Sequence, residues 1–88
     1  MVNRPSKPRE PNSHEYDFHG MRAVEAERRL KQILDRHGRQ SGAVLYIIHG
    51  KGTGTLAEIV QKIANQHPRV EHVQRQFVND GVTRIEMA

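Results

Sequence analysis

The sequence predicts a two-layer α/β sandwich, in which two helices pack on one side of a four-stranded mixed sheet. Apolar residues recur at helical spacing in two segments, 23–37 and 56–66. Four other segments have the apolar or alternating composition of strands: residues 16–19, 43–48, 70–77 and 82–87. The expected order of elements is therefore β-α-β-α-β-β.

The composition restricts the class of protein. The chain has 88 residues and a net charge of +4 at pH 7, with a pI near 10.0. This length allows one small domain, which buries only about 60% of the surface of its unfolded chain. The absence of cysteine excludes disulfides and thiolate zinc sites and favours a cytoplasmic location. No apolar run approaches the ~18 residues of a membrane span, so we expect no membrane partner.

Residues 1–13 are predicted to be a flexible, basic, proline-rich tail that precedes a domain at residues 14–88. Prolines and cations alternate in this segment, with almost nothing apolar between them. Such a composition cannot bury enough surface to order itself. The tail is interpreted as a linker to other domains or to a partner protein, and a basic arm that touches phosphates is the alternative.

The first strand and the first helix are predicted before residue 38. Tyr16–His19 alternates aromatic and polar residues and stops at Gly20, which is typical of a short strand followed by a turn. From Ala23 to His37 the apolar positions fall three and four residues apart, as in an amphipathic helix. Gly38 is expected to end this helix in the left-handed conformation.

The second half of the pattern begins with Ala43–Ile48, which is apolar throughout and therefore needs cover on both faces. A capping box at Thr55–Glu58 is expected to start the second helix, and Pro68 is expected to end it. The first two strands should be parallel, because a right-handed helical crossover joins them. Asp80-Gly81 favours a hairpin between the last two strands.

Both parallel strands end in His-Gly, at His19-Gly20 and at His49-Gly50. Because the carboxyl ends of parallel strands meet at one edge of a sheet, His19 and His49 should lie together where open α/β folds bind ligands. Asp17 precedes His19 by two residues on the same face of the strand, and its carboxylate can fix the tautomer of the imidazole. The alternative is that Asp17 bonds a turn and His19 only ends a strand.

A glycine-rich loop, Gly50-Lys51-Gly52-Thr53-Gly54-Thr55, follows the second histidine. Its glycines permit positive φ, and its last residues lie at the positive end of a helix dipole, where an anion is favoured. Lys51 adds a full charge, so phosphate is the expected ligand. The spacing fits neither a P-loop nor a dinucleotide fingerprint, which makes a nucleic-acid backbone the leading candidate. A turn needed only for strand-helix packing is the alternative.

The two motifs together resemble those of the Smr (small MutS-related) domain family. Asp17-Phe18-His19-Gly20 is similar to its Asp-Leu-His-Gly motif, His49–Gly54 is similar to its His-Gly-x-Gly motif, and the similarity runs from about Tyr16 to Met87. The resemblance implies a fold like the C-terminal domain of a bacterial translation initiation factor, nucleic-acid binding and, in many members, nicking of DNA or cleavage of RNA. The functional positions that it implies are Asp17, His19, Gly20, His49, Gly50, Lys51, Gly52 and Gly54.

This chain departs from the family pattern at three places. Arg22 stands where a threonine often caps the first helix, so that helix lacks an obvious cap and gains a cation able to reach a phosphate. Phe18 replaces an aliphatic residue, a change of volume that the buried side should tolerate. The longer glycine-rich connection of the family is reduced to Asn79-Asp80-Gly81, which predicts weaker or different binding if that loop grips the substrate.

The expected function is that of an endonuclease, which cleaves phosphodiester bonds in RNA or DNA. The amides of Gly50 to Thr55, with Lys51, would hold the phosphate. His19, oriented by Asp17, and His49 would share the roles of general base and general acid. Lys51 and Arg22 would stabilise the charge of the transition state.

No metal site is predicted, because two-metal hydrolysis needs several clustered carboxylates and this edge supplies only Asp17. Attack by a ribose 2′-OH is therefore favoured, and with it RNA. A single Mg²⁺ held by Asp17 and the phosphate is the alternative, and it would allow DNA nicking. Two functions without catalysis stay open: a nucleic-acid-binding module and a protein-interaction module, either of them within a larger MutS-like repair or recombination protein.

Overall fold

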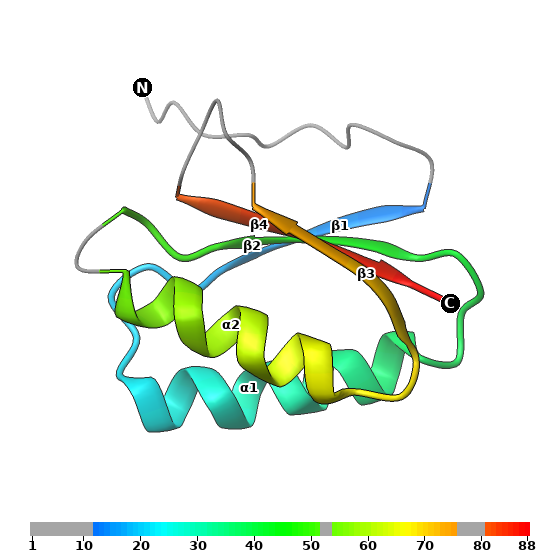
Figure 1. Ribbon diagram of the computed structural model, residues 1–88, viewed down its shortest axis with the longest axis horizontal. Helices are drawn as coiled ribbons and strands as arrows, with labels where there is room; N and C mark the ends of the chain where they lie inside the picture. The colour runs from blue at the N-terminus through cyan, green and yellow to red at the C-terminus, as the bar shows by residue number, and fades with distance from the viewer. Residues whose placement is uncertain (1–11, 52–53, 76–80) are drawn as a thin grey trace.

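Six elements follow one another in the predicted order, in a computed structural model that describes residues 12–51, 54–75 and 81–88. They are β1 (Ser13–Asp17), α1 (Ala23–His37), β2 (Val44–Ile48), α2 (Thr55–Gln66), β3 (Val70–Arg75) and β4 (Val82–Met87). Figure 1 shows the two helices packed against each other on one side of the sheet. The predicted two-layer sandwich is confirmed.

The sheet has the strand order β1-β2-β4-β3. β1 and β2 are parallel, as the helical crossover requires, whereas β4 is antiparallel to both β2 and β3. The sheet is therefore mixed. Asp17 is level with Ile48 in the parallel pair, and the N–H of Phe18 extends the pairing by donating to the Ile48 carbonyl at 2.7 Å. The chain thus leaves β1 and β2 at the same edge of the sheet.

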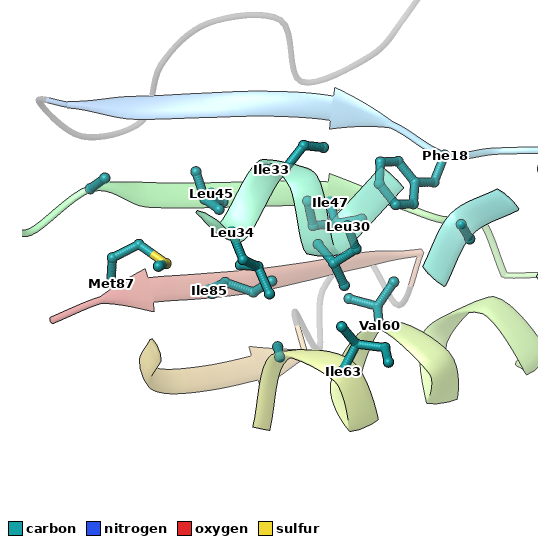
Figure 2. Packing of buried hydrophobic residues seen from close by; sticks show 13 residues of the cluster. Phe18, Leu30, Ile33, Leu34, Leu45, Ile47, Val60, Ile63, Ile85 and Met87 are labelled. Atoms are coloured by element: carbon teal, nitrogen blue, oxygen red, sulfur yellow. The ribbon is translucent and has the colours of Figure 1, made fainter. Parts of the chain in front are cut away.

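The core lies between the sheet and the two helices. Its larger side chains are Phe18, Leu30, Ile33, Leu34, Leu45, Ile47, Val60, Ile63, Ile85 and Met87. Burial of one side chain of this size stabilises the fold by about 1.5–3 kcal/mol. Figure 2 shows Phe18 pointing from the end of β1 into this cluster, so the aromatic ring is accommodated there. Phe18 therefore anchors the chain between two exposed residues, Asp17 and His19.

β2 is buried on both faces, as its apolar sequence predicts. Leu45 and Ile47 belong to the cluster beneath the helices. Val44 and Tyr46 form a second buried cluster with Val82 of β4 on the opposite face of the sheet. β2 is therefore the interior strand that holds the second His-Gly motif in place.

The bounds of β1 differ from the prediction of Tyr16–His19. The strand begins at Ser13, because backbone pairing with β2 extends it over residues whose side chains have no strand pattern. It ends at Asp17, and a turn follows in which the N–H of Met21 donates to the Phe18 carbonyl at 3.0 Å. His19 consequently lies in a turn rather than in a strand.

The expectation that Gly38 ends α1 in the left-handed conformation is wrong. Gly38 has the right-handed helical angles φ −62° and ψ −14°. A Cβ added to it would lie 3.0 Å from the Leu34 carbonyl oxygen and 3.3 Å from Cγ of Arg69. Arg69 also donates from Nε to the Gly38 carbonyl at 3.1 Å. Glycine therefore leaves room here for the close approach of Arg69, and its φ does not require glycine.

Several predicted features lie outside the described residues. They are residues 1–11 of the predicted tail, Gly52 and Thr53 of the loop, and residues 76–80, which include Asn79 and Asp80 of the expected hairpin turn. The division into a tail and a domain stays a prediction, although β1 already starts at Ser13. Within the described ranges, neither helix has the length and apolar character needed to cross a membrane.

Candidate functional site

A pocket of about 430 Å³ lies where β1 and β2 end and where α1 and α2 begin. Figure 1 shows that these four chain ends lie at the same end of the molecule. The predicted site residues that line the pocket are His19, Gly20, His49, Gly50, Lys51, Gly54 and Thr55. The two His-Gly motifs, distant in the sequence, therefore come together as their strand order predicts.

Asp17 supports the turn that carries His19. Its Oδ1 accepts a hydrogen bond from the backbone N–H of His19 at 2.9 Å. The expected contact between this carboxylate and the imidazole ring is not formed, because the turn after Phe18 brings the main chain of His19 to the carboxylate instead. Asp17 thus positions His19 through the backbone, which is the alternative interpretation of the motif.

The imidazole of His19 is accessible from solvent. Its side chain is exposed, lines the pocket and makes no hydrogen bond to any residue that the structure describes. Gly50 lies beside the ring with φ +81°, and a Cβ added to Gly50 would be 3.3 Å from Cδ2 of His19. Both the backbone angle and the close approach require glycine at this position. The ring nitrogens of His19 are therefore available to a ligand.

His49 has the opposite environment. Only 4% of it is exposed, and both ring nitrogens have partners within the protein. Nδ1 is 2.8 Å from the Gly50 carbonyl, which can only accept, so Nδ1 carries the proton and donates it. Nε2 is 2.8 Å from Oγ1 of the buried Thr83, whose hydroxyl donates to it. The ring of His49 therefore holds the start of the loop against β4.

The start of the loop is also tied down by its main chain. The backbone N–H groups of His49 and Gly50 both donate to the carbonyl of Gly81, at 2.9 and 3.0 Å. The amide of Gly50, expected to help hold a phosphate, therefore already has an acceptor in this structure. In the described part of the loop, the amides of Lys51 and Gly54 make no hydrogen bond to a described residue.

The second helix does not start with the predicted capping box. Gly54 is its N-cap, with φ +85°, and Thr55 is already the first helical residue. Because the left-handed conformation of Gly54 begins the helix one residue earlier than expected, Thr55 does not occupy the cap position. α1 also begins without a side-chain cap, at Arg22. Neither N-cap residue therefore closes the first turn of its helix with a side chain.

The two helix starts give the pocket a positive end. Ala23 of α1 and Thr55 of α2 are the first helical residues, and both line the pocket. The first amides of a helix lie at the positive end of its dipole and attract anions. Lys51 is exposed and lines the same pocket. Arg22 is exposed beside it, although its own side chain is not part of the lining.

Comparison with known proteins gives this fold and pocket a family. A sequence model of the Smr domain matches residues 16–88. The chain belongs to the Smr domain family. The resemblance of the two motifs is thereby confirmed over all of the described domain from Tyr16 onward.

Relatives of this Smr domain are found in much longer proteins. It is 39% identical over 72 residues to the endonuclease MutS2 of Synechocystis sp. and 37% identical over 74 residues to that of Staphylococcus epidermidis. These matches cover 82% and 84% of this chain but only 8% and 10% of the relatives. The crystal structure of the Smr domain of Thermus thermophilus MutS2 superposes with a TM-score of 0.75 at 28% identity, over 84% of this chain and 96% of that chain.

The Smr domain uses two residues that the sequence analysis did not assign to the site. Thr83 bonds the ring of His49, and Gly81 bonds the start of the loop. A signal for Thr83 was present, because Thr83, Ile85 and Met87 alternate on one face of β4 and a hydroxyl on an apolar face needs a buried partner. Gly81 offered no comparable signal.

The described residues contain no group of three or more histidine, aspartate or glutamate side chains that could hold a metal ion. Asp17 offers one carboxylate near the pocket edge, and its Oδ1 already accepts the His19 N–H. Of the described residues near the pocket, Asp17 could contribute one ligand to a Mg²⁺ that is bound jointly with a phosphate.

Proposed function

We propose that this Smr domain binds a nucleic-acid phosphate in the pocket and cleaves the phosphodiester bond there. The observation that carries the proposal is the exposed imidazole of His19 in a pocket that also contains Lys51 and the starts of both helices. The MutS2 proteins that match this chain are named endonucleases, which supports the same chemistry. Because this chain spans about a tenth of their length, their whole activity is not transferred to it.

The phosphate is held by charge from three directions. Lys51 supplies a full positive charge, and the first amides of α1 and α2 add two helix dipoles directed at one pocket. Each helix start favours an anion by a few tenths to about 1 kcal/mol in an exposed setting. The same groups stabilise the additional negative charge that develops on the phosphate in the transition state.

His19 transfers the proton. Its unbonded ring nitrogens allow it to remove a proton from the attacking hydroxyl or to protonate the leaving oxygen. One imidazole performs one of these steps for each bond cleaved, and water performs the other. The hydrogen bond from the His19 N–H to Asp17 fixes the main chain from which the imidazole projects.

His49 is a positioning residue in this proposal, because its hydrogen bonds to Gly50 and Thr83 occupy both ring nitrogens. It stabilises the turn at Gly50 against which His19 packs. The earlier expectation that both histidines exchange protons with the substrate is therefore replaced by one accessible imidazole and one that supports it.

RNA is the first substrate to test. Attack by the neighbouring ribose 2′-OH needs a base and electrostatic stabilisation, and His19 and Lys51 supply these groups. Cleavage of DNA requires an external nucleophile, which a Mg²⁺ held by Asp17 and the phosphate would activate. Dependence on a divalent cation therefore distinguishes the two substrates.

The test is a cleavage assay on RNA and DNA of the same sequence, each with EDTA and with Mg²⁺. For the parent protein we expect RNA cleavage that survives EDTA. His19→Ala should lower the rate at least about 100-fold, the usual contribution of a positioned acid or base. His72→Ala is the matched control, because His72 is exposed on β3 and does not line the pocket.

An activity that persists unchanged in His19→Ala would identify a contaminating nuclease and contradict the proposal. Cleavage of DNA alone, abolished by EDTA, would still support phosphate binding in the pocket. It would replace the metal-independent step by the Mg²⁺ alternative.

A nucleic-acid-binding module without catalysis is the second candidate. The observation that favours it is that only one of the two motif histidines is accessible, since His49 is buried. In that case the parent protein binds RNA or DNA without cleaving it, and His19→Ala leaves the affinity within about twofold, because the phosphate is held by other groups.

A further inference from the structure

Three arginines recur at every seventh position of α1 and its cap. Arg22, Arg29 and Arg36 are all exposed. Seven residues of an α-helix advance about 10.5 Å and return to almost the same side of it. The three arginines therefore lie along one flank of α1, with Arg22 at its N-cap, in a row about 21 Å long. We call Arg22, Arg29 and Arg36 the arginine row.

The arginine row lies on the flank of α1 that faces away from α2. The flank toward α2 is identified by Asp35, whose Oδ1 is 2.9 Å from Nε2 of His67 just after α2, and by Lys31, which lines the same groove. Arg29 and Lys31 are two residues apart and therefore about 160° apart around the helix. The row is thus not covered by the second helix.

The arginines of the row are not ion-paired with any described residue, although Glu25 lies about one helical turn from both Arg22 and Arg29. They also form no side-chain hydrogen bond with any described residue, whereas Lys31 on the other flank pairs with Glu27 at 3.1 Å. Residues 22–39 contain six Lys or Arg and three Asp or Glu, which amounts to +3 of the chain's net +4. Much of the positive charge of the chain therefore lies on this segment.

The row begins at the pocket. Arg22 lies between Met21 and Ala23, which both line the pocket. α1 then leads away from the pocket toward the opposite end of the molecule, as Figure 1 shows. A polyanion held at the pocket by one phosphate can therefore continue along the row.

We propose that the arginine row binds the backbone of a nucleic-acid duplex arm that continues from the phosphate held in the pocket. Each strand of a duplex has one phosphate per 3.4 Å of axis, so a row of about 21 Å spans about six base pairs. A duplex is straight and stiff over this length, so a straight row of guanidinium groups can lie along it and contact the phosphates where the strands cross the row. The inference rests on the proposed function, because the pocket supplies the point from which the arm extends.

The test compares two double variants that remove the same charge. Arg29→Gln with Arg36→Gln removes the outer part of the row and leaves the pocket residues untouched. Arg28→Gln with Lys62→Gln is the control, because Arg28 and Lys62 are equally exposed but lie off the row. Binding is measured by fluorescence anisotropy with duplexes of about four and about fourteen base pairs that carry the same single-stranded end, as RNA and as DNA, over a range of salt.

We expect Arg29→Gln/Arg36→Gln to weaken binding of the long duplex about tenfold and to reduce the slope of log affinity against log salt by about 2, since each phosphate contact contributes about 0.9. Binding of the short duplex should change less than about twofold, and the control should change neither by more than about twofold. Equal losses in the two double variants, or equal losses for the two lengths, would overturn the proposal.

The outcome separates the arginine row from the proposed function. If the parent protein binds and cleaves nucleic acid but Arg29→Gln/Arg36→Gln behaves like the control, only the proposal about the arginine row is wrong. If the parent binds neither duplex, both the proposed function and the proposal about the arginine row are wrong. Unchanged thermal unfolding of both double variants confirms that only the surface has been altered.

Discussion

The two His-Gly ends of this domain look alike in sequence and differ in structure. His19 is exposed, and its ring makes no hydrogen bond to a described residue, whereas His49 is 4% exposed and bonds Gly50 and Thr83 through its two ring nitrogens. Motifs of equal form therefore have unequal roles. In the proposed mechanism, the accessible imidazole transfers the proton and the buried one fixes the surface beside it.

The position of each strand in the sheet explains the difference. β1 is an edge strand, so the chain that follows it has a neighbour on one side only. β2 lies between β1 and β4, and the chain that follows it meets β4 on its other side. β4 and the residue before it provide Thr83 for the ring of His49 and Gly81 for its backbone. Burial of the second histidine is thus a consequence of strand order.

The largest expected effect on stability comes from His49→Ala. It removes a buried ring and leaves the hydroxyl of Thr83 without its acceptor, so the free energy of unfolding should fall by about 2–4 kcal/mol. His19→Ala, at an exposed site, should change it by less than about 0.5 kcal/mol while slowing cleavage at least about 100-fold. Urea unfolding of both variants measures the contrast. Similar stabilities for the two variants would contradict the different structural roles assigned to the two histidines.

Gly50→Ala tests the contact between the two motifs. Alanine at φ +81° is strained by about 1–2 kcal/mol, and its Cβ would displace the ring of His19. We expect cleavage to slow about ten- to a hundredfold. Gly42→Ala is the matched control, because Gly42 has φ +77° but no atom within 4 Å of an added Cβ. It should lose comparable stability and keep its cleavage rate, so equal rates for the two variants would contradict the assigned contact.

Thr83→Val should sharpen the role of His49. Valine preserves the shape of the side chain and removes the hydroxyl that donates to Nε2, which should lower the free energy of unfolding by about 1–2 kcal/mol. Thr83→Ser retains the hydroxyl. Ring ¹⁵N NMR should show a changed Nε2 signal for His49 with valine and a nearly unchanged one with serine. No change with valine would indicate that the hydroxyl is not the partner.

The smallest expected effect concerns a histidine remote from the pocket. Burial, and then the charge of the His37 ring, whose centroid lies 4.4 Å from that of His14, lower the pKa of His14 below 6.5. His14 therefore binds a proton more readily in the unfolded chain than in the folded chain. The free energy of unfolding should be unaffected by His14 above pH 6.5, and it should fall as the pH drops through the folded-state pKa. His14→Gln should reduce this acid destabilisation, whereas His72→Gln should not. Unfolding measured between about pH 5 and pH 8 tests the sign.

The order of elements and the meeting of the two motifs follow from local patterns. Periodicity identifies α1 and α2, and the parallel crossover brings His19 and His49 to one edge. The features that sequence reasoning missed depend on distant partners. Gly38 is in close contact with Arg69, which is distant in the sequence. The environment of His49 depends on its hydrogen bond to Thr83, which lies on the next strand in the sheet. The pattern of residues along one sequence does not show which distant residues become neighbours in the fold.

The absence of side-chain caps at the starts of both helices links ligand occupancy to the cohesion of the whole domain. An anion that accepts hydrogen bonds from both first turns would complete two helices at once, and these two helices form one entire layer of the sandwich. Under the proposed function, a bound substrate would therefore stabilise both helices. Binding of substrate should then raise the melting temperature, and release of product should lower it again.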